Sequence, residues 1–213
     1  MHPTLFLLLL TLTLSPQRAE ADELPTTCTY TTYRWSVPLK RGVDHRTVRH
    51  PYADLRPEEV DAATDCSVCE EDQEWIEVAN LPPFRLCRKL APQIGAALQR
   101  LAESGVPLIS LTGYRVGMTR GPTDADGLRT AFSNHSFGVA LDVNAELNGL
   151  YDHCPSFGPD CRLLLGGRWQ PDAPGGLSAD SAVVEGLREA GLRWGGEIAG
   201  KQKDFMHFSP TGY

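Results

Sequence analysis

Two segments of the chain repeat their apolar residues with the period of an α-helix. The first covers residues 86–104 and is followed by Gly105, a residue type that commonly ends helices. Its apolar positions, spaced four, four and three residues apart, are Leu90, Ile94, Leu98 and Leu101. The second covers residues 180–190 and is followed by Gly191. Its inward positions are Val183, Val184, Leu187 and Ala190. We therefore expect two helices, each with one apolar face.

Three shorter segments have the pattern of strands. Residues 106–112 form a short apolar run that predicts a buried strand. In residues 138–144 apolar and other side chains alternate, so the apolar ones share one face and Asp142 lies on the other. Residues 205–209 predict a third strand near the end of the sequence. The alternation therefore places a carboxylate where it can line a cleft.

The remaining segments predict irregular structure. Residues 116–129 and 145–177 are rich in Gly, with Asp and Thr in the first and Pro in the second, and both are expected to be loops. Residues 22–85 are polar, with many Pro, Thr and acidic residues, and only residues 56–60 suggest a short helix there. The periodicities therefore support a fold of mixed α and β.

The first residues carry the features of an export signal. Residues 5–14 are apolar except for two threonines, and Ala19-Glu20-Ala21 forms a small-residue cleavage site. A bilayer span needs about 20 apolar residues, so this run is too short, and no later run is longer. We therefore expect a signal peptide over residues 1–21, a Cys-containing extension over 22–85 and a main domain over 86–213, in a protein that is secreted or periplasmic.

Six cysteines form an even set, which in an exported protein predicts disulfides. Cys154 and Cys161 bracket a short Pro/Gly-rich segment and form the simplest pair. The pairing of the other four stays open. They are Cys28, Cys66, Cys69 and Cys87. The Cys66-x-x-Cys69 spacing also occurs in zinc knuckles and redox sites, but neither a second ligand pair nor a thioredoxin-like context is evident.

The net negative charge of the chain disfavours some classes of binding partner. Loss of Arg18 and Glu20 with the signal peptide leaves the net charge at −7. Such acidity argues against nucleic acid or an anionic membrane as the partner. We expect a monomer that acts on a specific substrate.

Few residues are available to hold a catalytic metal. Zinc in enzymes has three protein ligands drawn from His, Asp, Glu and Cys, with a fourth position for water or substrate. His135 and His207 lie in segments that suggest a site, where Asp142 could add a carboxylate oxygen and Asp204 a base. Spacing alone leaves a second interpretation open, in which the histidines are packed core residues and Asp142 caps a turn.

The motifs resemble one known superfamily of zinc peptidases. The chain contains Ser-x-His followed after six residues by Asp, over 133–142, and Asp-x-x-His over 204–207. Gly-Tyr-Arg at 113–115 and Trp-Gly-Gly at 194–196 occur in the same order. This combination is similar to the hedgehog/DD-peptidase superfamily, whose members include VanY-like D-alanyl-D-alanine carboxypeptidases and peptidoglycan L-alanyl-D-glutamate endopeptidases. The resemblance covers residues 86–213.

The resemblance implies a fold, a cofactor and a mechanism. It implies an α+β fold with a small antiparallel sheet that carries the zinc site, helices packed against that sheet, and a disulfide-tied irregular N-terminal region. It implies Zn²⁺ on His135, Asp142 and His207, with Asp204 as the general base. Arg115 would bind a substrate carbonyl or carboxylate and stabilise the developing oxyanion, and Ser133 would contact substrate. The substrates would be peptidoglycan stem peptides.

One departure from the superfamily concerns the substrate pocket. The endopeptidase branch continues Trp-Gly-Gly with Asp-Trp, whereas this chain has Glu197-Ile198. A longer carboxylate and the loss of an aromatic wall predict an altered pocket. Two other functions are weighed against a peptidase. One is a non-catalytic zinc-bearing binding module of the same fold, which has no need for Asp204. The other is a disulfide oxidoreductase that uses Cys66 and Cys69.

Overall fold

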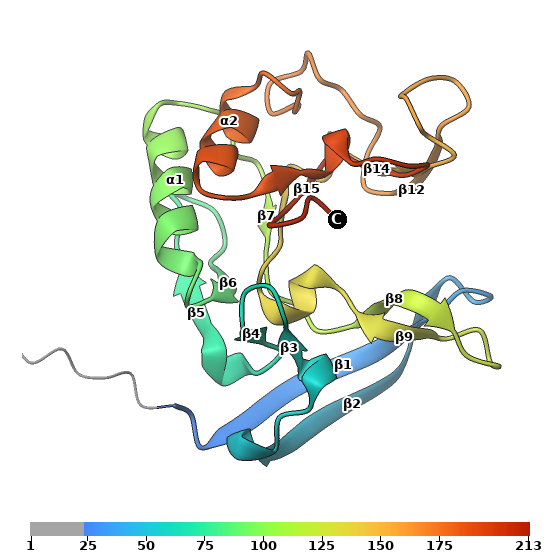
Figure 1. Cartoon of the computed structure of the whole chain (residues 1–213). Helices are drawn as coiled ribbons and strands as arrows, with labels where there is room; N and C mark the ends of the chain where they lie inside the picture. Colours follow the sequence, from blue (N-terminus) through green and yellow to red (C-terminus); the bar gives the residue numbers. More distant parts are fainter. Residues whose placement is uncertain (1–23) are drawn as a thin grey trace, which may run out of the picture.

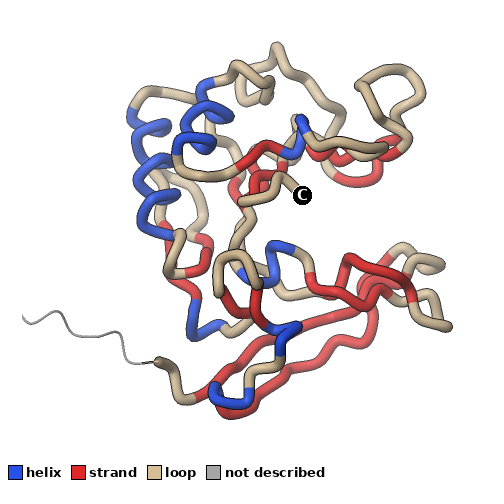
Figure 2. Tube along the Cα trace, viewed as in Figure 1, coloured by secondary structure: helices blue, strands red, loops and turns tan. Residues whose placement is uncertain are grey.

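The computed structural model describes residues 24–213, so the expected signal peptide over residues 1–21 lies outside the described residues. Within this range the chain forms two α-helices and several small sheets (Figure 1). Figure 2 shows the two α-helices together at one side of the molecule, with strands and short helical turns over the rest. The predicted α+β class is confirmed. None of the described helices is long and apolar enough to cross a bilayer.

A four-stranded antiparallel sheet lies beside the helices. Its strand order is β13 (Arg193–Trp194), β15 (His207–Ser209), β10 (Leu141–Val143) and β7 (Leu111–Thr112). One core cluster joins this sheet to both helices. Its fully buried members include Ile94, Leu98, Leu141, Leu187 and Phe208. Each such side chain contributes roughly 1.5–3 kcal/mol of burial free energy, which fixes the sheet against the helices.

Both predicted helices are present, with shorter bounds. Helix α1 covers Ala91–Glu103, because Pro92 suits a first turn and the preceding residues form strand β6 (Phe84–Cys87) instead. Strand β6 pairs with β5 (Gln73–Ile76). Helix α2 covers Ala182–Glu189 and contacts α1. The apolar positions named from the sequence form the buried faces of both helices, apart from the end residues Leu90 and Ala190.

The N-terminal region is less irregular than the sequence suggests. Strands β1 (Thr27–Ser36) and β2 (Arg41–Pro51) form a long hairpin. We did not expect it, because the hairpin buries only part of one face and its inward positions include Thr32 and Ser36 rather than an apolar alternation. Beyond the hairpin the region contains the two-stranded pair β3 (Val60–Asp61) and β4 (Cys66–Ser67).

Two segments expected to be loops contain strands. Strands β8 (Met118–Thr123) and β9 (Arg129–Phe132) pair with each other, and β1 pairs with β8, so the expectation of a loop over residues 116–129 is wrong. Residues 145–177 include β11 (Leu150–Asp152) and β12 (Arg162–Leu165), which join β14 (Lys203–Asp204) in a third sheet. Short irregular strands of this kind lack a period that the sequence can reveal.

Short 3-10 turns connect these strands. They cover Tyr52–Asp54, Pro57–Glu59, Glu70–Asp72, Asn134–Phe137 and Gly195–Glu197. The second is the short helix expected within residues 56–60. The strands expected over 106–112, 138–144 and 205–209 are present only in part, as β7, β10 and β15.

All six cysteines form disulfides. Cys154–Cys161 is the predicted pair, and the other two bridges are Cys28–Cys69 and Cys66–Cys87. Because Cys66 and Cys69 belong to different bridges, they form neither a redox pair nor a zinc knuckle. Three disulfides are typical of proteins that fold in an oxidising, extracytoplasmic compartment.

The Cys66–Cys87 bridge supports the turn that follows His135. The backbone N–H of Cys87 donates to the carbonyl of Gly138 at 2.9 Å. Gly138 has φ +66°, and a Cβ added there would lie 2.0 Å from Gln73 Oε1 and 2.5 Å from Cys87 N. The N-terminal region therefore approaches this turn so closely that only glycine fits.

A substitution at Gly138 measures this close contact. Gly138→Ala adds both left-handed strain and a collision with backbone, so we expect a loss of several kcal/mol in the free energy of unfolding. Gly105→Ala is the matched control, because Gly105 has φ +80° but nothing within 4 Å of its added Cβ. That control loses only about 1 kcal/mol. Equal losses in urea unfolding would contradict the contact.

A buried carboxylate lies at the centre of the N-terminal region. Glu59 is fully buried, and its Oε1 accepts hydrogen bonds from Tyr30 Oη at 2.5 Å and Arg56 Nη2 at 2.9 Å, with His50 Nε2 at 3.1 Å. Burial alone would raise the pKa of Glu59, but the bonds from Arg56 and Tyr30 outweigh it and lower the pKa from 4.5 to about 2.

This lowered pKa predicts a pH dependence of stability. A carboxyl whose pKa is lower in the folded state stabilises the fold above its unfolded pKa, and this contribution is lost as the pH falls. We expect the free energy of unfolding to decrease from pH 4.5 towards pH 2, and Glu59→Gln to remove part of that decrease. Glu58→Gln, an exposed neighbour, should leave the profile unchanged. Identical profiles for all three proteins in chemical unfolding would contradict the assignment.

Candidate metal centre

Three side chains from separate elements meet at one buried point. His135 comes from the 3-10 turn Asn134–Phe137, Asp142 from β10 and His207 from β15. Asp142 and His207 are direct partners in the antiparallel ladder, so the register itself brings them together. One ligand atom from each residue lies within 4.8 Å of the others, and all three residues are buried. The structure thus brings together the three residues that were named from the sequence.

The two ring nitrogens of His135 have different partners. His135 Nδ1 lies 2.8 Å from the carbonyl oxygen of Gly113, so Nδ1 must carry the proton that is donated. A neutral ring then points the lone pair of Nε2 at Asp142 Oδ1, only 3.1 Å away. Two acceptors at this distance repel each other unless a cation lies between them. The geometry therefore requires either a proton or a metal ion at this point.

His207 approaches the same carboxylate oxygen. Its Nδ1 lies 3.0 Å from Asp142 Oδ1, while its Nε2 is buried without a hydrogen-bond partner among the described residues. Burial alone would raise the pKa of Asp142, but His135 and His207 hold it well below its usual range. Asp142 is therefore ionised and can act as a ligand.

These distances fit a metal ion of the size of zinc. Ligands about 2.0–2.1 Å from a tetrahedral centre lie roughly 3.3 Å from one another, close to the separations observed here. Two imidazole nitrogens and one carboxylate oxygen suit zinc and leave one position for another molecule. The Gly113 carbonyl orients His135 in the way that outer hydrogen bonds usually orient metal-binding histidines. The sequence does not reveal this role of Gly113, although the residue belongs to the Gly-Tyr-Arg motif.

Arg115 lies at the edge of the group. Its Nη2 is 3.3 Å from Asp142 Oδ2, and its backbone N–H donates to the carbonyl of His135 at 3.1 Å. The side chain is 39% exposed, so the guanidinium can also reach a molecule in the solvent. Arg115 is thus held beside the His–Asp–His group with part of its surface exposed to solvent.

Asp204 lies on β14, three residues before His207. The residue is half-buried, but its Oδ1 is fully covered and has no hydrogen-bond partner among the described residues. Burial raises its pKa to about 6, against the opposing influence of His207. The charges of Asp142, Arg120 and Arg115 also act on this carboxyl. Asp204 is therefore suited to exchange protons near neutral pH.

The Trp-Gly-Gly segment holds the backbone of Asp204 in place. Trp194 Nε1 donates to the carbonyl of Phe205 at 2.7 Å. A Cβ on Gly195 would lie 2.4 Å from the carbonyl oxygen of Asp204, and one on Gly196 would lie 2.5 Å from the Trp194 ring. The motif noted from the sequence is thus the support against which the Asp204 strand packs.

Ser133 is buried just before the turn that carries His135. Its Oγ lies 3.3 Å from Ser136 Oγ, which in turn bonds both the N–H and the carbonyl of Gly117. The structure therefore explains Ser133 as part of a small polar cluster, and its contact with substrate stays a prediction.

Tyr213 provides an aromatic ring beside the altered Glu197-Ile198 segment. Ile198, Trp194 and Tyr213 line one open cavity of about 570 Å³. The Tyr213 ring also covers the guanidinium of Arg120, whose Cζ lies 4.4 Å from the ring centroid. Neither Arg120 nor Tyr213 was named from the sequence, because both lie outside the motifs.

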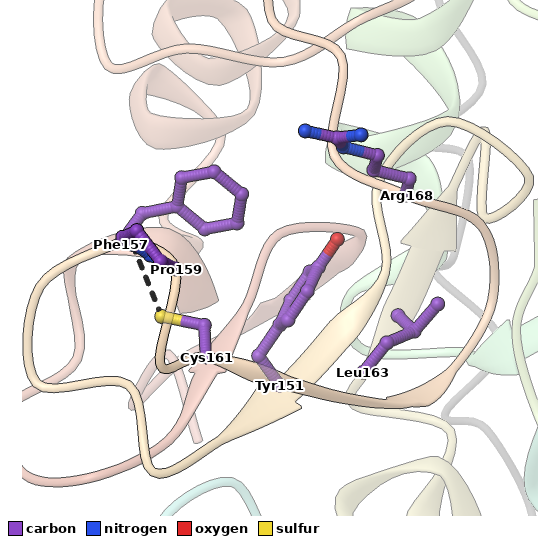
Figure 3. A pocket seen from close by; sticks show the side chains of 7 residues that line it. Tyr151, Phe157, Pro159, Cys161, Leu163 and Arg168 are labelled. Carbon is purple, nitrogen blue, oxygen red and sulfur yellow. Dashed lines mark hydrogen bonds between the residues drawn. The ribbon is translucent and has the colours of Figure 1, made fainter.

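A second open cavity lies against the third sheet. It measures about 530 Å³ and is formed by β11, β12 and the loop closed by Cys154–Cys161. The side chains of Tyr151, Phe157 and Arg168 point towards one another across it (Figure 3). Neither cavity is lined by a residue of the His–Asp–His group, so neither is assigned to the chemistry.

Comparison with known proteins agrees with this geometry. Residues 127–210 match the model of a family described as D-alanyl-D-alanine carboxypeptidase. Comparisons with curated proteins and with solved structures gave no match. The matched segment includes all three residues of the buried group and Asp204. Residues 127–210 are therefore similar to the D-alanyl-D-alanine carboxypeptidase family of peptidases, and the buried group lies within this similar segment.

Proposed function

We propose that this protein is a secreted or periplasmic zinc-dependent peptidase that hydrolyses peptidoglycan stem peptides, as an L-Ala-D-Glu endopeptidase or a D-Ala-D-Ala carboxypeptidase. The observation that carries the proposal is the buried His135, Asp142 and His207 group, together with the Asp204 carboxyl, whose covered Oδ1 has no hydrogen-bond partner within residues 24–213. A pure binding module has no need for Asp204 at this place. The family match supports a peptide as the substrate.

The proposed metal site consists of His135 Nε2, an oxygen of Asp142 and His207 Nδ1. When bound, zinc supplies a Lewis acid that polarises a carbonyl and lowers the pKa of water towards about 7. Asp204 takes the proton of the attacking water and returns it to the leaving amine. Its raised pKa, about 6, suits both steps.

Arg115 and Ser133 have proposed roles in substrate binding. The guanidinium of Arg115 lies beside Asp142 and is partly exposed, so it can bind the carbonyl on which negative charge develops. A fixed donor of this kind typically contributes about 2.7–4 kcal/mol to transition-state stabilisation. Ser133 would add a polar contact to the bound peptide near His135.

The chain is proposed to consist of three segments. We propose a signal peptide over residues 1–21, an N-terminal extension over 22–85 and a peptidase domain over 86–213. The three disulfides support export, and the bridge Cys66–Cys87 fastens the extension to β6, from which the Cys87 N–H donates to the carbonyl of Gly138 after His135. A monomeric state stays a prediction.

Two variants separate metal binding from proton transfer. His207→Ala should lower the zinc content of the purified protein and abolish hydrolysis, because it removes a ligand. Asp204→Asn should retain zinc but lower kcat by roughly 10²–10⁴-fold, because it removes only the base. Metal analysis and hydrolysis assays on both variants check this pair. Loss of zinc in Asp204→Asn, or unchanged turnover, would contradict the assigned roles.

Digestion of muropeptides tests the substrate class. The mature zinc-loaded protein is incubated with stem peptides of several types, and the products are identified by mass spectrometry. We expect cleavage at one of the two proposed bonds, with inhibition by a chelator and recovery with zinc. If no stem peptide is cut, the peptidase proposal fails, and zinc-dependent binding without cleavage would identify a binding module instead.

A further inference from the structure

Arg120 is a cation that the roles described above do not use. It lies on β8, five residues after Arg115, opposite Ala131 in the ladder with β9. Its side chain is half-buried, yet no hydrogen bond or ion pair within residues 24–213 involves its guanidinium. Burial therefore lowers its pKa from the usual value. This combination of burial and missing partner needs an explanation.

The other partly buried arginines of the described chain differ from Arg120. Arg34 pairs with Asp124 at 2.5 Å, and Arg115 lies 3.3 Å from Asp142. Arg120 instead has only the ring of Tyr213 over its guanidinium, at 4.4 Å. Such a cation–π contact stabilises by roughly 0.5–2 kcal/mol, whereas withdrawal of an unpaired charge from water costs several. The contacts of Arg120 within residues 24–213 therefore do not offset the free-energy cost of burying its charge.

The surroundings place Arg120 at the edge of the metal centre. Its charge acts on Asp204, and the charge of Arg115 acts on the same carboxyl. Tyr213, which covers Arg120, accepts a hydrogen bond from Asn134, the neighbour of His135. Arg120 therefore borders the region where the proposed substrate meets Asp204 and Arg115.

We propose that Arg120 binds a carboxylate of the substrate close to the scissile bond. A guanidinium forms two parallel hydrogen bonds to a carboxylate, and the Tyr213 ring against one face leaves its edge free to do so. The assignment rests on the proposed peptidase function and narrows it to peptides with a free carboxylate at the cleavage site. In stem peptides that group is the C-terminal carboxylate or the free carboxylate of γ-linked D-Glu.

Two pairs of synthetic peptides distinguish these sources. The first pair is acetyl-L-Lys-D-Ala-D-Ala with a C-terminal carboxylate or carboxamide. The second is L-Ala-γ-D-Glu-L-Lys, amidated at the C-terminus, with the α-carboxylate of D-Glu free or amidated. The candidate scissile amide is N-methylated in all four, so that titration calorimetry on the mature zinc-loaded protein measures binding without turnover.

We expect the acid of one pair to bind roughly 10- to 100-fold more tightly than its carboxamide, as for other hydrogen bonds to charged groups. Arg120→Gln should remove this preference, and Arg120→Lys should retain part of it, because lysine keeps the charge without the paired geometry. Arg129→Gln, which removes the same charge from the adjacent strand β9, should retain the full preference. If Arg120→Gln does not fold, a reduced preference for the acid in Arg120→Lys tests the assignment instead.

Three results would overturn the assignment. They are equal binding of acid and carboxamide in both pairs, a preference that survives Arg120→Gln, and absence of binding to all four peptides. These results are separate from the test of the peptidase itself. A protein that cleaves muropeptides without an acid preference loses only the role of Arg120, whereas one that binds the acid through Arg120 and cleaves nothing loses only the peptidase activity.

Discussion

The hydrogen bond between His135 and the carbonyl of Gly113 determines the chemistry of the site. Because Nδ1 of His135 donates its proton to this carbonyl, Nε2 keeps a lone pair, which faces Asp142 Oδ1 at 3.1 Å. Because the site is buried, water cannot relieve the contact between these two acceptors. The fold therefore brings the candidate donor atoms of three residues together at one buried point, where a cation would relieve this repulsion.

The segment that supplies this carbonyl depends on the N-terminal region. Tyr114 Oη donates to the carbonyl of Val68 at 2.6 Å, and the backbone N–H of Tyr114 donates to the carbonyl of Arg85 at 2.7 Å. The backbone N–H of Arg115 donates to the carbonyl of His135. The disulfide-tied N-terminal region thus positions both the turn that carries His135 and the arginine beside it, and its contacts with residues 113–138 join it to the rest of the described structure.

The sequence predicted which residues form the buried His–Asp–His group better than it predicted the strands. His135, Asp142 and His207 stand out because few histidines are available and because the motifs resemble a known superfamily. Both helices were also predictable, since their apolar faces repeat over several turns. The hairpin of β1 and β2 was not predicted, because a half-exposed sheet rich in Thr shows little alternation of apolar and polar residues.

Arg120 and Tyr213 could not be found from sequence for a different reason. They are distant along the chain, and only the folded backbone brings the ring of one over the guanidinium of the other. No spacing rule relates a residue of β8 to the last residues of the sequence. The roles of Trp194 and Gly195 were likewise visible only as a motif until the structure showed what they contact.

The direct pairing of Asp142 with His207 has a consequence for how such a protein can change. These residues are 65 positions apart, yet the ladder between β10 and β15 sets their separation regardless of the chain that connects them. Doubling the length of a connecting loop costs only about 0.6 kcal/mol in closure entropy. The connection, with its own disulfide and its own small sheet, can therefore accept insertions and new surfaces while the ligand geometry stays constant.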